Sequence, residues 1–334
     1  MPPTNPLLSR VAEAVYWFGR YIERAENVAR FLDVNHNLML DLPQGYADQW
    51  QPIVDTTGDR APFFERYGAA TQASVVRFLA FDPENPNSIY SCALAARENA
   101  RSVRETIPSE MWRQINQLYL LITEESRRTD PTDLPTFCHR VRMGCHLIHG
   151  ILHAGMSHNE AWQFIRLGTV LERADKTTRI LDVKYFILLP DPADVGSVVD
   201  DLLWAALLHS VSGYEMFRRR HGRILPDKVV DFLVLDRDFP RAIQYCLAST
   251  RDSLHAISGT PLSTFRYAPE KLIGQLCSDL SFASVDEIIG HGLHEYLDEL
   301  QTRMNSVSAG IYETFFAIKA QQSQKRAPRQ LQSQ

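Results

Sequence analysis

The amino-acid sequence predicts an all-α protein: a bundle of about twelve helices, internally duplicated into two halves related by an approximate two-fold axis. Three observations lead to this prediction. Apolar residues recur every three or four positions over nearly the whole chain, as they do on one face of a helix. Alternating strand patterns joined by Asn-Gly or Asp-Gly turns are missing, so we expect almost no sheet. One segment occurs twice, which indicates an internal repeat.

The first predicted helix shows the helical pattern most clearly. Its apolar residues are spaced so that they share one face: Val11, Ala12, Val15, Phe18, Ile22, Ala25, Ala29 and Leu32. Similar stripes follow almost to the end of the chain, and proline-containing segments at 130–131 and 189–192 separate them. Since proline and glycine end helices, we expect these segments to be loops.

The repeat is the strongest organisational signal. Residues 19–34 align with residues 168–183 at an offset of 149, and eight of the sixteen aligned positions are identical. Further along, residues 75–82 align with residues 229–236 at an offset of 154, which continues through Cys92 and Cys246. A change of five residues in one loop explains both offsets. Chance similarity would not keep its register over such a length, so we expect a duplication.

The duplication predicts the domain organisation. We expect a first half over residues 1–156 and a second half over 157–320, packed as one compact unit in the manner of a two-fold symmetric dimer. Residues 321–334 are polar, glutamine-rich and basic, a composition typical of disorder.

Composition excludes several classes of protein. The 334 residues are 45% hydrophobic and 22% charged, with a formal net charge of −5, which argues against a general nucleic-acid binder. No apolar run approaches the roughly 20 residues that span a bilayer, and the first residues lack the pattern of a secretory signal. The five cysteines form no C-x-x-C pair. This number and spacing suit reduced thiols, so we expect a cytoplasmic protein without membrane or nucleic-acid partners.

Each copy of the repeat carries a charged stripe. At about 100° per residue, five residues of the first copy fall within one arc of about 80° along the border of the core. They are Gly19, Glu23, Glu26, Arg30 and Asp33, and their counterparts are Gly168, Glu172, Asp175, Arg179 and Asp182. A glycine inside a helix costs about 1 kcal/mol relative to alanine. We therefore expect each glycine to allow another backbone or a ligand to come close.

The arginines that follow the glutamates, Arg24 and Arg173, project about 100° away from the stripe. The predicted partners of the glutamates are therefore other arginines. If the two helices cross antiparallel, Glu23 pairs with Arg179 and Glu172 pairs with Arg30. Within each helix, the spacing also predicts ion pairs between residues four apart, 26 with 30 and 175 with 179.

Two interpretations of the stripes remain open. In the first, they form a charge network that joins the halves and fixes their register. In the second, they line a cleft for a charged ligand, such as an amino acid or a peptide end, with arginine binding its carboxylate. The second interpretation makes Glu23 and Glu172 the candidate catalytic residues, as general bases.

Other candidate residues are less distinctive. Arg97 and Glu98 lie in a charged helical segment that is typical of a solvated face, with a partial echo at 251–252. Four histidines and two cysteines share one predicted helix: His139, His146, His149, His153, Cys138 and Cys145. Arg142 falls within the same arc and would repel a cation, so we expect no metal site. Phosphate-binding loops and nucleophile elbows are missing, and we expect no cofactor.

At these residues the sequence resembles the bacterial alpha-E family, a helical domain of unknown function with a conserved Glu-Arg motif. The resemblance rests on segments that follow in order over most of the chain: 8–26, 96–101, 162–175 and 235–241. The motif residues include Arg24, Arg97, Glu98 and Arg173. Members are typically encoded beside, or fused to, a circularly permuted ATP-grasp protein. Transglutaminase-like and proteasome-like peptidase proteins often accompany them.

The resemblance implies a role in a system that ligates or modifies peptides. We expect an accessory or substrate-binding partner of an ATP-grasp amide ligase rather than an independent enzyme. The first alternative is an enzyme that acts on a peptide or amino acid with glutamates and arginines between the halves. The second alternative is a structural scaffold.

Overall fold

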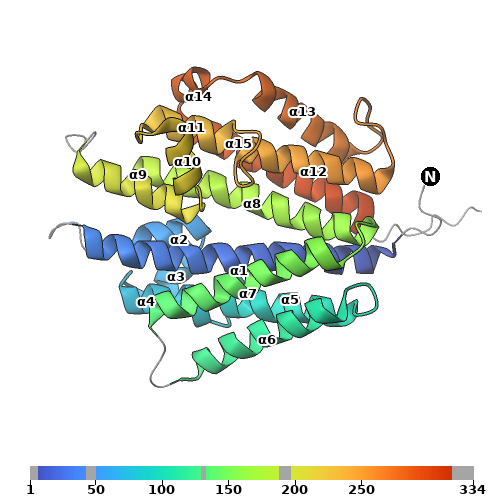
Figure 1. Ribbon diagram of the computed structural model, residues 1–334, viewed down its shortest axis with the longest axis horizontal. Coiled ribbons are helices and arrows are strands. Elements are labelled where there is room, and N and C mark those ends of the chain that lie inside the picture. The colour runs from blue at the N-terminus through green and yellow to red at the C-terminus, as the bar shows by residue number, and fades with distance from the viewer. Residues whose placement is uncertain (1–6, 43–49, 129–132, 188–196, 318–334) are drawn as a thin grey trace, which may run out of the picture.

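The computed structural model describes residues 7–42, 50–128, 133–187 and 197–317. Within these ranges the chain forms fifteen α-helices and no strand (Figure 1). The all-α prediction is therefore confirmed. The number exceeds the expected twelve because short helices accompany the long ones. No helix in the described ranges is long and apolar enough to cross a membrane. The predicted tail, residues 321–334, lies outside the described residues.

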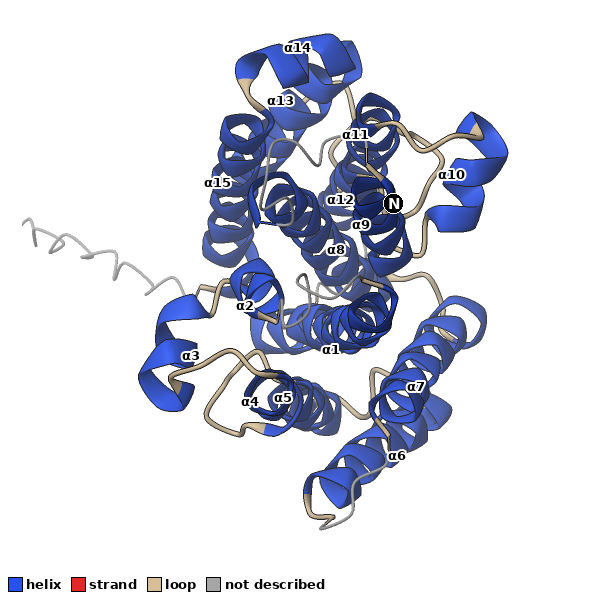
Figure 2. Ribbon diagram, turned by 90° about the vertical axis from the view of Figure 1, so that its left-hand side faces the viewer, coloured by secondary structure: helices blue, strands red, loops and turns tan. Residues whose placement is uncertain are grey.

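Two long helices form the centre of the molecule: α1 (Ser9–Asp41) and α8 (Glu160–Ile187). They lie side by side (Figures 1 and 2). They run in the same direction, because contacts join the start of one helix to the start of the other and later residues to later residues. The backbone N–H of Leu7 donates to Glu160 Oε2 at 3.0 Å, and farther along Arg24 contacts Glu172. The antiparallel crossing on which the expected ion pairs depended is therefore wrong.

Each central helix has its own three long neighbours. Around α1 lie α5, α6 and α7, where α6 packs on the other two: Ile89–Ser102, Ser109–Ser126 and Leu134–Gly155. Around α8 lie α12, α13 and α15 in the corresponding arrangement: Ile243–Ser258, Ala268–Phe282 and Leu293–Ile311. Figure 2 shows the first group below the central pair and the second group above it. The predicted boundary at 156–157 falls between α7 and α8.

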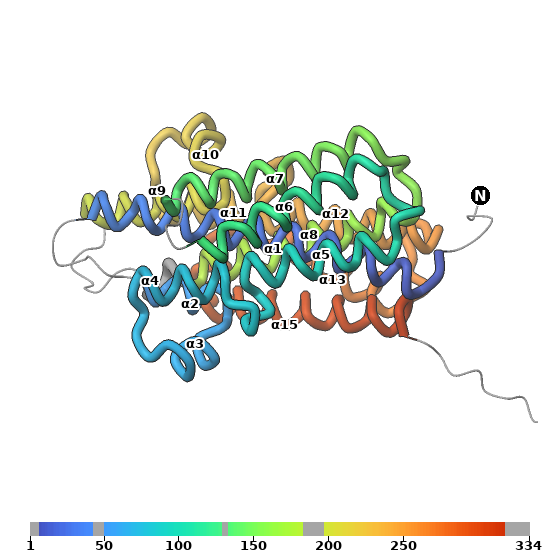
Figure 3. Tube along the Cα trace, turned by 90° about the horizontal axis from the view of Figure 1, so that it is seen from below, coloured from blue at the N-terminus to red at the C-terminus, as the bar shows by residue number. Residues whose placement is uncertain are grey.

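Shorter helices complete the fold. The first set is α2 (Gln51–Thr57), α3 (Arg60–Tyr67) and α4 (Gln72–Val76). The second set is α9 (Val198–Ser210), α10 (Tyr214–His221), α11 (Pro226–Val234) and α14 (Val285–His291). Single π-helical turns occupy 77–81 and 312–316. Figure 3 shows α2, α3 and α4 gathered near the end of the bundle where α1 finishes, with α9 and α10 at the same end.

One continuous apolar core runs through both groups of helices. All five cysteines are free and buried within it. Burial raises the pKa of the Cys92 and Cys246 thiols to about 12 in each case, because the thiolate form is desolvated. These two cysteines therefore pack as small apolar side chains.

Candidate functional site

The central helices touch at the two repeated glycines. A Cβ atom built on Gly19 would overlap the carbonyl oxygen of Ile165, and one on Gly168 would overlap the carbonyl oxygen of Tyr16. The backbones are too close there for any side chain, so both positions require glycine. Each glycine therefore allows the approach of another backbone, not of a ligand.

The glutamates and arginines of the motif pair across this contact. Arg24 donates to Glu172 through Nε at 2.7 Å and through Nη2 at 3.0 Å. Arg173 donates to Glu23 in the same way, through Nε at 2.9 Å and through Nη2 at 2.7 Å. Both are two-point contacts between guanidinium and carboxylate, the geometry that arginine provides best. Each helix therefore supplies the carboxylate of one pair and the guanidinium of the other.

This pairing corrects the expected one. The pairs of Glu23 with Arg179 and of Glu172 with Arg30 do not occur. In two parallel helices, residues at the same distance along each axis lie side by side, so residues 23 and 24 face residues 172 and 173. The arginine side chain is long enough to span the 100° that separates Arg24 from the stripe. Arg30 and Arg179 instead pair within their own helices. Arg179 Nε donates to Asp175 Oδ2 at 2.9 Å, and Arg30 contacts Glu26.

Each buried glutamate has further cations around it. Arg241, from the loop before α12, contacts Glu23 Oε1 at 3.1 Å, Asn27 Oδ1 at 3.1 Å and also Glu26. Glu172 accepts from Arg20 Nε at 2.8 Å and lies 3.6 Å from Lys176 Nζ. These residues form two clusters, named here the Glu23 cluster and the Glu172 cluster.

The two clusters differ at two aligned positions, where one cluster has an asparagine and the other has a cation. Asn27 aligns with Lys176 at the offset of 149, and Asn87 aligns with Arg241 at the offset of 154. The Glu23 cluster therefore has Asn27 and Arg241, whereas the Glu172 cluster has Lys176 and Asn87, whose Oδ1 accepts from Arg24 Nη1 at 2.7 Å. Sequence reasoning missed Arg241 and Lys176. The signal that could have found them is the replacement of an asparagine by a cation at each of these aligned positions.

Both central carboxylates are completely buried, with side-chain exposures of 0%. Burial alone would raise the pKa of Glu23, but the guanidiniums of Arg173 and Arg241 outweigh it and lower that pKa to about 2. Arg24, Arg20 and Lys176 likewise overcome the effect of burial and hold the pKa of Glu172 well below its usual range. Both side chains are therefore ionised at neutral pH. A general base works best with a pKa near the operating pH, so this environment favours the network interpretation.

The last residues of the two stripes contact the outer long helices. Asp33 Oδ2 lies 3.0 Å from Arg142 Nη2 of α7. Its counterpart Asp182 lies 2.6 Å from His294 Nδ1 of α15. The stripes thus hold α7 and α15 to the central pair by corresponding contacts, one with an arginine and one with a histidine.

The remaining candidates lie apart from the motif pairs or only at their edge. Arg97 donates to Asn116 and Glu98 at 2.7 and 2.8 Å, and its guanidinium lies over the rings of Trp112 and Tyr119 of α6. Arg97 and Glu98 therefore belong to the contact between α5 and α6.

The histidines of α7 do not gather. His146 Nε2 lies 3.3 Å from Glu26, and His149 Nε2 lies 3.8 Å from Glu23. His139 lines a groove between α6 and α7, and the His153 ring contacts the His158 ring. Among the described residues, no three histidine, cysteine or acidic side chains are placed to hold a metal ion. Burial lowers the pKa of His149 and so favours its neutral form.

An open cleft of about 510 Å³ lies beside the Glu23 cluster, between α1, α7, α9 and the start of α10. Its polar lining consists of Arg30, Asp33, Asn37, Asp41, Arg142, His209, Ser212 and Glu215. Its apolar lining consists of Val34, Leu38, Leu202, Ala205 and Ala206. This volume falls within the range of about 300–1,000 Å³ that is usual for ligand sites. Glu23 and Glu172 do not line it, but two residues of the first stripe, Arg30 and Asp33, do.

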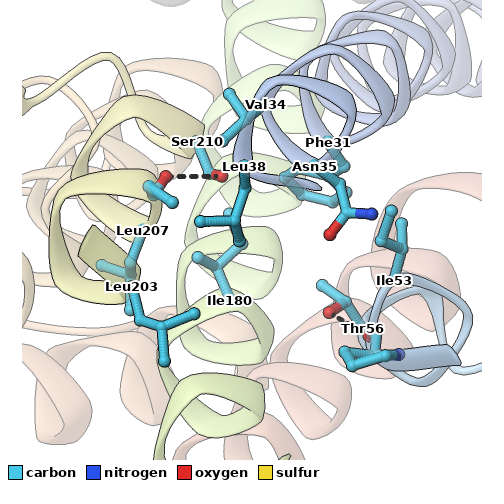
Figure 4. A pocket seen from close by; sticks show the side chains of 12 residues that line it. Phe31, Val34, Asn35, Leu38, Ile53, Thr56, Ile180, Leu203, Leu207 and Ser210 are labelled. Atoms are coloured by element: carbon cyan, nitrogen blue, oxygen red, sulfur yellow. Dashed lines mark hydrogen bonds between the residues drawn. The ribbon is translucent and has the colours of Figure 1, made fainter. Parts of the chain in front are cut away.

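A second, apolar pocket of about 70 Å³ adjoins the cleft and shares Val34, Leu38 and Ala206 with it. Figure 4 shows Leu38, Ile180 and Leu203 lining this pocket. Hydroxyl groups at its edge are satisfied locally, since Ser210 donates to the carbonyl oxygen of Ala206 at 2.9 Å. The pocket is far smaller than an ordinary ligand site.

The fold and the site thus define an all-helical protein whose two central helices are joined by reciprocal, buried Glu–Arg pairs. The chain belongs to the Alpha-E family, described as a predicted alpha-helical domain with a conserved ER motif, whose sequence model matches residues 7–316. The adjacent pairs Glu23-Arg24 and Glu172-Arg173 fit that description.

The chain is similar to three curated mycobacterial proteins, each named as uncharacterized. It is 23% identical over 316 residues to one from Mycobacterium bovis and to one from Mycobacterium tuberculosis strain CDC 1551. It is 22% identical to a third, from M. tuberculosis strain H37Rv. Each match covers 87% of this chain but 34% of the relative. The chain therefore spans about a third of the length of these relatives. No solved structure matches it.

Proposed function

We propose that this chain is a non-catalytic partner of an ATP-grasp amide ligase and that it holds the ligase's peptide substrate or product. The observation that carries the proposal is the separation of the motif from the open cleft. Glu23 and Glu172 are buried, ionised and bonded to arginines of the opposite helix. The cleft that a ligand can enter contains arginines and acids but neither of these carboxylates. This arrangement suits binding better than general-base catalysis.

We also infer that the halves, residues 1–156 and 157–320, are copies of one unit related by an approximate two-fold axis. Contacts that recur at the sequence offset of 154 support the inference. Arg66 pairs with Asp82, and Arg220 pairs with Asp236. The Sγ atom of Cys92 approaches the carbonyl oxygen of Pro86, and that of Cys246 approaches the carbonyl oxygen of Pro240. In this view the motif pairs hold the two copies in register, as buried ion pairs do in some proteins.

The link to an ATP-grasp ligase rests on the typical association of the family with circularly permuted ATP-grasp proteins. The ATP chemistry then belongs to the partner, in keeping with a sequence that lacks a phosphate-binding loop. The length of the mycobacterial relatives supports the same idea, because about two thirds of each lies outside the match. Transglutaminase-like and proteasome-like peptidase proteins are further candidate partners. We propose a cytoplasmic location, which the five free, buried thiols support.

Two alternatives remain. An enzyme with Glu23 or Glu172 as general base would need one of them exposed to substrate and with a raised pKa. A pure scaffold would leave the 510 Å³ cleft without a ligand. The ligase proposal differs from both, because it requires a specific complex and an effect on a partner's ATP consumption.

Co-purification tests the proposal. The tagged chain is expressed together with a circularly permuted ATP-grasp protein from the same organism, purified, and assayed for ATP consumption in the presence of a peptide. The proposal predicts a stable complex and ATP consumption that depends on this chain. Arg142→Gln, inside the cleft, should reduce the ATP consumption, whereas the matched Arg140→Gln, exposed on the same helix, should not. Lack of association when both proteins are present would contradict the proposal.

A further inference from the structure

The cleft beside the Glu23 cluster has an unusual distribution of charge. Arg30 and Arg142 lie together at one end, and Asp41 lies at the other, at the exposed C-terminal end of α1. Apolar side chains of α1 and α9 line the space between. The cleft therefore has its arginines at one end, where Asp33 pairs with Arg142, an apolar wall in the middle and Asp41 at the other end.

The arginine end has hydrogen-bond donors without acceptors. The Nε atoms of Arg30 and Arg142 are both buried, and neither has a partner. The side chain of Arg30 is only 6% exposed. A buried donor without an acceptor is unfavourable, and charged donors are the most costly to leave in that state. Each guanidinium is already paired through Nη2, that of Arg30 with Glu26 and that of Arg142 with Asp33. Both line the same cleft, so one anion toward which they turn would supply the acceptor that each Nε lacks.

Three guanidiniums, those of Arg30, Arg142 and Arg241, gather at this end around the carboxylates of Glu26 and Asp33. Burial lowers the pKa of Arg30, and the nearby guanidiniums of Arg241 and Arg142 contribute in the same direction, although Glu26 opposes them. Glu26 is itself shared between Arg30, Arg241 and His146. Its negative charge is therefore divided among several partners. A carboxylate is the natural anion, since guanidinium and carboxylate match in shape.

The length of the cleft distinguishes a peptide from a free amino acid. Residues 30 and 41 are eleven positions apart on α1, which corresponds to about 16 Å along the helix axis. The ammonium and carboxylate of a single amino acid cannot span that distance. An extended peptide advances at most about 3.3–3.6 Å per residue, so roughly five residues would connect the two ends.

Ser212 adds a second sign that the cleft has a function. Its φ of 53° lies in the left-handed region, and it alone among the described non-glycine residues has a positive φ. The aligned residue in the first half is Gly58, with a φ of 79°. A serine is strained where glycine would be relaxed, and such strain tends to occur at functional sites. Ser212 lines the cleft, so the strained backbone conformation occurs at the wall of the cleft itself.

We propose that this cleft binds the C-terminal end of a short extended peptide. The terminal carboxylate enters between Arg30 and Arg142, and the chain runs along α1 and α9. The N-terminal ammonium of a peptide of about five residues then reaches Asp41. This inference rests on the proposed function and specifies its ligand: the ligase partner adds to, or releases, a peptide with a free carboxylate.

Calorimetric titration of the purified full chain tests the inference. The probes are a set of pentapeptides that differ in their C-terminal residue, each as the free acid, as the C-terminal amide and as the N-acetylated acid. The inference predicts that free acids bind, that amidation weakens binding at least tenfold, and that acetylation weakens it several-fold. Equal binding of acid and amide, or no binding of any free acid at millimolar concentration, would overturn it.

Variants separate the cleft from the rest of the protein. Arg142→Gln should weaken binding of the free acid at least tenfold and leave the weak binding of the amide unchanged, whereas Arg140→Gln should change neither. Ser212→Gly should raise the melting temperature and weaken binding, while Ser212→Ala should weaken binding without that gain. If Arg142→Gln binds the free acid as the natural chain does, the site is wrong.

The titration uses no ligase, so its result is independent of the co-purification. A complex with the ligase but no carboxylate-dependent peptide binding would overturn this inference and leave the proposed function standing. Peptide binding without a complex would overturn the proposed function and leave the peptide site standing.

Discussion

Arg24 and Glu172 lie 148 positions apart in the sequence, yet they form a two-point ion pair, with Nε–Oε1 and Nη2–Oε2 distances of 2.7 and 3.0 Å. The side chain of Glu172 is completely buried. Arg173 and Glu23 form the same contact in the reverse sense. The adjacent Glu-Arg dipeptide has a simple physical explanation in this arrangement. The parallel helices bring the two dipeptides side by side, and the glutamate of each pairs with the arginine of the other.

Glu172→Gln should destabilise the protein strongly. The substitution keeps the shape of the side chain but leaves Arg24, Arg20 and Lys176 without the buried carboxylate that they surround. Removal of one partner from a buried ion pair costs about 3–5 kcal/mol. Denaturant unfolding of the variant measures this cost. The exposed Glu105→Gln is the control, and a similar small effect for both substitutions would show that the pair is not structural.

Gly19→Ala should destabilise the protein although alanine favours helices. The added Cβ overlaps the carbonyl oxygen of Ile165, and overpacking of this kind costs about 1–3 kcal/mol. Gly150→Ala in α7 is the matched control, because no atom lies within 4 Å of its Cβ position. That substitution should stabilise by about 0.5–1 kcal/mol. Thermal unfolding of both variants gives the comparison, and equal shifts would contradict the close approach of α1 and α8.

Acid should weaken the fold through Glu23. The folded protein lowers the pKa of this carboxyl from 4.5 to about 2, so folding favours its ionised form. Its contribution to stability is present above pH 4.5 and is lost as the pH falls towards 2. Urea unfolding at a series of pH values should show this loss, and Glu23→Gln, less stable throughout, should show a shallower one. A natural chain whose stability stays constant from pH 5 to pH 3 would contradict the assignment.

Local sequence was enough to predict the helices and to single out both motif glutamates. The spacing of apolar residues from Val11 to Leu32 determines the buried face of α1. Gly19 and Gly168 stand out because glycine is unfavourable inside a helix. These features depend on one helix at a time, which explains why a single sequence reveals them.

The ion-pair partners depend on how distant helices are placed, and there the local argument failed. The choice between Arg24 and Arg30 as the partner of Glu172 depends on whether α8 runs parallel or antiparallel to α1. Neither helix encodes that direction by itself. Arg241 illustrates the same limit, since it lies 218 residues from Glu23 in the sequence and reaches it from a loop. The cleft escaped prediction for a related reason, because its lining comes from four separate helices.

A double-mutant cycle on Arg24 and Glu172 tests most directly whether the Glu-Arg motif joins the two central helices. The cycle compares the free energies of unfolding of Arg24→Ala, Glu172→Ala, the double variant and the natural chain. A second cycle does the same for Arg30 and Glu172, which share no contact. The reciprocal pairing predicts a coupling of about 1–3 kcal/mol in the first cycle and nearly none in the second. A first cycle without coupling, or a larger coupling between Arg30 and Glu172, would contradict it.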